Sequence, residues 1–161
     1  MNELARLQNL MQQTYSGKCF YGDSITKVFS DIDPAQAVWI PGDGGNHSIW
    51  QIVLHMTGWL NIIRERLTSP VLVNLSEELN YPSPPLGTHD NWNATLDAFH
   101  AAHDGLSEAI GVLPETKLES EVPGREYTFD VLLHGAIHHN LYHLGQIAMI
   151  KSMYSRRDVA A

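Results

Sequence analysis

The sequence predicts an all-α protein, a bundle of four long helices with an extra short helix and long loops between helices. Four segments carry apolar residues at the three- and four-residue spacing of an amphipathic helix, and each spans about 14 to 25 residues. Strand signals are weak, because only short pieces such as 70–75 could form strands and no alternating hairpin pattern appears. The length of 161 residues fits a single domain over 1–161.

The first long helix is expected over 2–15, where apolar residues recur at helical spacing. The stretch GKCFYGDS at 17–24 contains two glycines and predicts a loop, and a short helix follows at about 23–31. The next segment is rich in turn residues, with room for one helical turn at 34–38.

The second long helix has a clear start. Ser48 and Gln51 have the S-x-x-Q spacing of a capping box directly before an apolar periodic run, so a helix is expected over 48–68, ending before Pro70. The segment SEELNYPSPPLGT at 76–88 is rich in proline and is expected to be a loop rather than the interior of a helix.

The last two long helices are expected over 90–110 and 128–153. The first of them stops near Gly111 and Pro114, and Thr128 or a neighbour caps the second.

Composition excludes several classes of protein. A formal net charge of -8 without any block of like charges is poorly suited to a phosphate backbone, so no nucleic-acid partner is expected. Cys19 is the single cysteine, which rules out an intrachain disulfide framework and predicts a small apolar filler. We find neither a signal-peptide pattern nor an apolar run of membrane-spanning length, so we expect a cytoplasmic protein without a membrane association.

Histidines on the last helix divide between two faces. At about 100° per residue, His139 and His143 lie on one stripe of an otherwise mainly apolar face. Residues that also lie within about 60° of His139 include Leu132, Ala136, Gln146 and Ile150. His134 and His138 form a second pair on a face turned away from this stripe, and we expect them at the surface or at an interface.

A third histidine lies on the inward stripe of the second long helix. His55 shares that stripe with residues within about 60° of it, which include Ser48, Gln51, Ile52, Trp59 and Ile62. Buried polar groups cost free energy unless they are satisfied, so three inward imidazoles need a common reason. A divalent metal ion bound by His55, His139 and His143 supplies that reason, and three protein ligands leave a coordination position open, as in catalytic zinc sites.

A histidine-rich core satisfied by glutamine, asparagine and tyrosine partners is the alternative, because the H-x-x-x-H spacing alone arises readily in a chain with nine histidines. The other four histidines are expected to have no functional role. His100 and His103 form a pair on the third long helix, and His47 and His89 are expected in loops or caps.

Three stretches together resemble the DinB/YfiT-like superfamily of metal-dependent four-helix-bundle proteins. HSIWQIVLHMTGW at 47–59 resembles its second-helix motif, and HHNLYHLGQI at 138–147 resembles its last-helix motif, H-x-x-x-H-x-G-Q. GKCFYGDSITKVFSDIDPAQAVWIPG at 17–42 resembles the segment between the first two helices in one branch of the family.

The resemblance implies an up-down bundle with zinc or nickel held by His55, His139 and His143. It also implies a homodimer and a small-molecule substrate. Related proteins include thiol S-transferases and a thiol-dependent isomerase that use a low-molecular-weight thiol, and others are regarded as hydrolases. A metal-dependent hydrolase or thiol S-transferase is therefore expected; the alternative is a non-catalytic metal-stabilised bundle or a dimeric scaffold that uses the face of His134, His138 and Leu141.

The metal chemistry can take two forms that the sequence does not separate: activation of water for hydrolysis, or binding of a thiol as its thiolate. The catalytic acid or base stays unassigned, since neither histidine stripe carries a carboxylate. Gln146 is expected to orient a ligand or to fill a polar gap, and Tyr142 to donate from the pocket edge. Trp59 is expected to pack in the core. Arg66 lies on the same stripe of the second long helix as His55, three turns further along. The 17–24 loop could cover the site.

Overall fold

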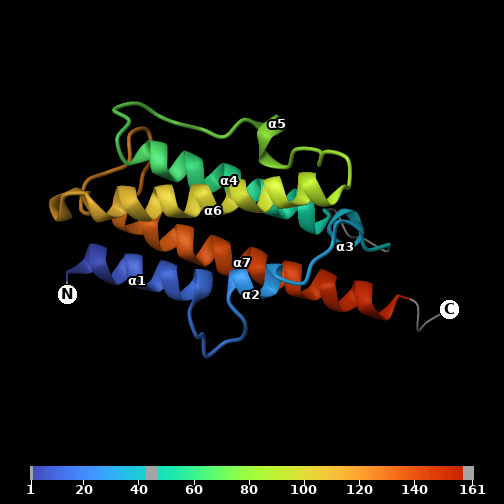
Figure 1. Ribbon diagram of the computed structural model, residues 1–161. Coiled ribbons are helices and arrows are strands. Elements are labelled where there is room, and N and C mark those ends of the chain that lie inside the picture. The colour runs from blue at the N-terminus through green and yellow to red at the C-terminus, as the bar shows by residue number, and fades with distance from the viewer. Residues whose placement is uncertain (1, 43–46, 158–161) are drawn as a thin grey trace.

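The computed structural model describes residues 2–42 and 47–157, and within them every regular element is helical (Figure 1). The elements are α1 (Glu3–Ser16), α2 (Ile25–Phe29), α3 (Pro34–Val38), α4 (Ile49–Arg66), α5 (Glu77–Asn80), α6 (His89–Gly111), the 3₁₀ helix η1 (Glu115–Lys117) and α7 (Phe129–Arg156). The prediction of an all-α fold is confirmed, and residues 70–75 form no strand. None of the described helices is both long enough and apolar enough to cross a membrane.

The four long helices begin at capping residues that the sequence supplies. Ser48 and Gln51 form the predicted capping box at the start of α4, and Thr128 accepts a hydrogen bond from the backbone N–H of Val131 at the start of α7. Asn2 and Thr88 cap α1 and α6 in the same way. These caps satisfy backbone donors that a helix leaves unpaired at its N-terminus.

The long helices form a ring in which each contacts two neighbours. α4 packs against α6 and α7, and α1 packs against the same two helices from the other side. The apolar stripes meet in one core, whose largest fully buried side chains include Trp50, Phe99 and Phe129. The indole N–H of Trp50 donates to Thr95 Oγ1 at 2.9 Å, so this buried donor is satisfied.

The helix directions differ from the expected alternation. α4 and α6 run in the same direction, antiparallel to α1 and α7, which makes the order up-down-down-up (Figure 1). The reason is the 67–88 connection, which returns along α4: Val73 contacts Arg66 near the helix end, and Asn80 contacts His55 closer to its start. An extended chain covers about 3.3 Å per residue against 1.5 Å for a helix, so this connection can span the whole of α4.

One short element departs from the sequence expectation. Residues 77–80, which we expected to be part of a proline-rich loop, form the single turn α5, capped by the Ser76 side chain. The prolines of this segment follow the turn, so none of them lies inside a helix, where proline is disfavoured. The turn matters because its last residue, Asn80, lies against the histidine cluster.

Candidate metal centre

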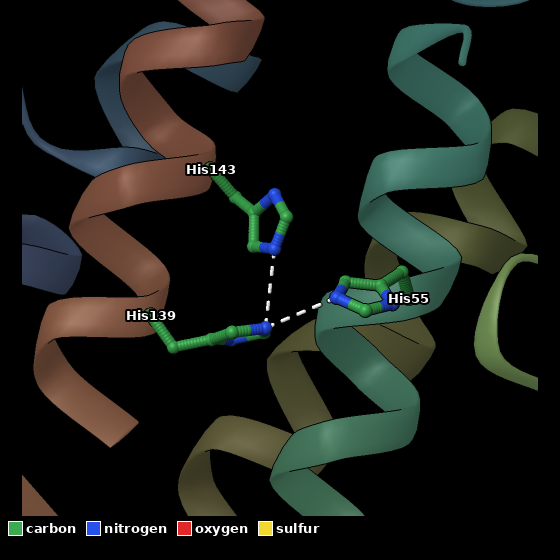
Figure 2. Close-up of side chains that lie close together, drawn as sticks. All are labelled: His55, His139 and His143. Atoms are coloured by element: carbon green, nitrogen blue, oxygen red, sulfur yellow. Dashed lines mark hydrogen bonds between the residues drawn. The ribbon is translucent and has the colours of Figure 1, made fainter. Parts of the chain in front are cut away.

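His55 of α4 and His139 and His143 of α7 point their rings toward a common centre (Figure 2). The Nε2 atom of His139 lies 3.0 Å from Nε2 of His55 and 3.1 Å from Nε2 of His143. The antiparallel packing of α4 on α7 brings the single histidine opposite the pair, which is one helical turn apart. The structure thus brings together all three residues that the sequence nominated as metal ligands.

The separations of the nitrogen atoms fit a shared metal ion. Zinc–nitrogen bonds of 2.0–2.1 Å in tetrahedral geometry place two ligand atoms about 3.3 Å apart, close to the 3.0 and 3.1 Å seen here. A small shift of the side chains would admit the ion.

Hydrogen bonds at the opposite edge of two rings leave the inward nitrogens free to ligate. Nδ1 of His55 lies 2.6 Å from the backbone carbonyl oxygen of Asn80, and Nδ1 of His143 lies 2.6 Å from Oε1 of Gln146. Since both partners are acceptors, each Nδ1 carries the ring proton and donates. The neutral rings therefore present an Nε2 lone pair at the centre, which is the tautomer a metal requires.

Burial keeps the cluster neutral at physiological pH. Burial, with smaller contributions from the neighbouring His143 and His55, lowers the pKa of His139 to about 3. Burial also lowers the pKa of His143 to about 4, against the opposing effect of the hydrogen bond that this ring donates to Gln146. The pKa of His55 is lowered, again mainly by burial. Neutral imidazoles are the metal-binding form, so the electrostatics and the tautomers agree.

Aromatic rings enclose His55 and His139. The Tyr81 ring stacks on His55 at 4.1 Å between centroids and, on its other face, on His47 at 3.8 Å. The Trp59 ring lies 6.0 Å from the His139 ring and donates its indole N–H to Asn80 Oδ1. These rings restrict both the orientation of the ligands and the access of water.

The polar residues named from the sequence have distinct places. Gln146 accepts from His143 and donates to the hydroxyl of Tyr142, so it fixes the orientation of the His143 ring. Gln51 serves the capping box and not the site. The 17–24 loop lies elsewhere: Tyr21 donates to Thr14 on α1 and shares a groove with Gly145, on the side of α7 away from His143.

Two residues that contact His55 were not predicted from the sequence. Asn80 and Tyr81 belong to the irregular connection between α4 and α6, where no periodic pattern predicts which way a residue faces. They reach His55 only because the chain runs back along α4.

The remaining histidines follow the expectation in part. His138 is exposed and His134 is half-buried, as expected for the outer face of α7. His103, for which the sequence predicted no functional role, is 1% exposed and stacks on Tyr15 at 3.7 Å, because α1 covers this face of α6. His134 also approaches Glu3 and Asp130, but its Nδ1 donates to the Asp130 carbonyl and all three side chains are partly exposed.

A family model described as the DinB superfamily matches residues 22–147. The matched segment contains all three clustered histidines as well as Asn80 and Gln146. Comparisons with curated proteins and with solved structures found no match.

Proposed function

The chain belongs to the DinB superfamily, and from this premise we propose that it is a metalloenzyme with a three-histidine divalent metal site, acting on a small molecule as a hydrolase or a thiol S-transferase. The observation that carries the proposal is the convergence of three neutral imidazole nitrogens from α4 and α7 on one point. All three candidate ligands are histidines, and a set of imidazole nitrogens favours zinc or nickel over magnesium or calcium, which prefer oxygen ligands.

A metal ion with three protein ligands and an open position supplies Lewis acidity, either toward water or toward a thiol. The protein's own groups have separate tasks. The Asn80 carbonyl and the Gln146 amide fix the rings of His55 and His143, and the stacked Tyr81 ring keeps His55 from rotating.

Tyr142 is our candidate for a donor to the substrate. Its hydroxyl oxygen accepts from Gln146 Nε2 at 3.2 Å, so its own hydrogen is left to donate, and the side chain is 64% exposed at the rim of the cluster. It lies beside His143, with ring centroids 5.1 Å apart.

Metal content tests the proposal directly. Protein purified without an affinity tag and incubated with zinc or nickel should hold about one ion per chain by mass spectrometry, and His143→Ala should lose it. His138→Ala is the matched control, because this exposed histidine of the same helix points away from the cluster and its loss should leave the metal content unchanged. A wild-type protein that folds normally yet stays free of metal refutes the proposal.

Activity separates catalysis from a structural role for the ion. The metal-loaded protein should convert a member of a panel of esters, amides, and thiol–electrophile pairs, and His143→Ala should abolish turnover while it stays folded. If the variant only melts at a lower temperature and no member of the panel is ever converted, the non-catalytic metal-stabilised bundle is the better description.

A further inference from the structure

A cavity of about 290 Å³ lies beside the histidine cluster, between α4 and α7. His139 lines it, and along both helices it extends away from the cluster to Arg66 and Tyr127. The remaining lining residues, most of them apolar, are Trp59, Ile63, Val131, Leu132, Gly135 and Ala136. An apolar cavity of about 150 Å³ holds benzene, so this one accommodates a ligand of roughly a dozen non-hydrogen atoms.

Arg66 brings a charge into this largely apolar space. It is 3% exposed; its Nε donates to the Val73 carbonyl at 2.9 Å and its Nη1 to the Tyr127 hydroxyl at 3.1 Å. Its Nη2 is buried without a hydrogen-bond partner. Among the described residues no carboxylate forms an ion pair with Arg66.

A second arginine increases the local positive charge. Burial lowers the pKa of Arg66, and the positive charge of Arg125 lowers it further. The Nε atom of Arg125 is itself buried without a hydrogen-bond partner. A guanidinium stays protonated in proteins, and an unpaired buried charge is expensive, so this end of the cavity lacks an anion that would complete it.

We propose that the cavity binds an elongated, mainly apolar carboxylate, with its carboxylate held by Arg66 and Tyr127 and its other end beside His139. The Tyr127 oxygen accepts from Arg66, which leaves its own hydrogen to donate, and one guanidinium with one hydroxyl matches the single charge and two oxygens of a carboxylate. Trp59 lies between the two ends of the cavity, because its ring centroid is 5.6 Å from the Arg66 guanidinium carbon and 6.0 Å from that of the His139 ring.

This inference deepens the proposed function by naming its substrate class, and it rests on that function only for what happens at the His139 end. The probe is 4-phenylbutanoate, compared with 4-phenyl-1-butanol and 4-phenylbutylamine. Calorimetry on both zinc-loaded and metal-free protein should find the carboxylate bound at least about tenfold more tightly than the alcohol, as expected for a charge-assisted hydrogen bond, and the amine weakest.

Side-chain changes locate the anion. Arg66→Met and the gentler Tyr127→Phe should both reduce the preference for the carboxylate over the alcohol. Arg64→Met is the matched control, since it removes an equal charge from an exposed position of the same helix and should leave the preference intact. If Arg66→Met does not fold, Tyr127→Phe still tests the assignment, because it removes one hydroxyl and no packing.

A blocking variant tests the cavity itself. Gly135 lines the cavity, and a Cβ added there meets no atom within 4 Å, so Gly135→Leu should fold and abolish binding of the probe. Gly145→Leu is the control on the same helix, equally open but outside the cavity, and it should bind as the wild type does.

The outcomes separate this proposal from the metal centre. A carboxylate preference that appears only with zinc bound and survives Tyr127→Phe means that the ion takes the carboxylate, which overturns the proposal and leaves the metal centre standing. A preference that persists in a protein unable to bind metal upholds the proposal while the proposed function fails. Equal affinity for carboxylate and alcohol in both forms overturns it outright.

Discussion

At the scale of single residues, the candidate metal centre depends on atoms outside the three histidine side chains. The Asn80 carbonyl and the Gln146 amide each hold one imidazole proton, and this decides which nitrogen faces the centre. Only Gln146 can be changed by substitution without moving the backbone. It is therefore the residue that best tests whether ring orientation contributes to metal affinity.

Gln146→Leu should weaken zinc binding by about 10- to 100-fold, because the His143 ring loses the acceptor that fixes its tautomer and orientation. Competition against a chromophoric chelator measures this. Gln146→Glu keeps an acceptor and should retain most of the affinity, and Gln13→Leu, at an exposed glutamine of α1, should have no effect. Affinity unchanged in Gln146→Leu would show that the hydrogen bond does not tune the site.

At the scale of elements, α4 carries both the site and its support. One helix provides His55 for the cluster, Trp59 for its enclosure and Arg66 for the far end of the cavity. The register of these side chains depends on where the helix begins, and the capping box at Ser48 and Gln51 determines that start.

Ser48→Ala should lower the free energy of unfolding by about 0.5–2 kcal/mol, because the backbone N–H of Gln51 loses its acceptor at a buried position. Chemical denaturation measures the change. Ser155→Ala, at an exposed position inside α7, should stay within about 0.5 kcal/mol of the wild type. A loss no larger than that control would mean that packing alone sets the start of α4.

At the scale of the whole molecule, burial of the histidine cluster links folding to pH. The pKa values of about 3 and 4 for His139 and His143 in the fold lie below the ordinary histidine value of 6.5. Between these limits the unfolded chain binds more protons than the folded chain, so stability rises with pH there. The contribution is complete above about pH 6.5 and declines as the pH falls toward 4.

The melting temperature of the metal-free protein should therefore fall between pH 7 and pH 5, a window in which most carboxylates stay ionised. Replacing both His139 and His143 by Leu should flatten this dependence, whereas His138→Ala should not. Zinc affinity should decline over the same window, since the ligands must be neutral. A melting temperature that is independent of pH in the wild type contradicts the neutral, buried cluster.

The helical bundle could be predicted from the sequence because the signals that specify each helix lie within the segment that forms it. Helical periodicity and capping residues specify where α1, α4, α6 and α7 lie, and the angular position of a residue on its own helix identifies an inward face. The grouping of His55, His139 and His143 followed from that rule. The predicted metal, homodimer and reaction stay predictions, because composition and periodicity do not report on partners.

The tertiary structure alone decided the rest. The parallel course of α4 and α6, the approach of Asn80 and Tyr81 to His55, and the pairing of Arg66 with Tyr127 all depend on how irregular segments return across the bundle. Such contacts join residues far apart in the chain and leave no period in the sequence. They arise only when the helices pack and each buried polar group must find a partner.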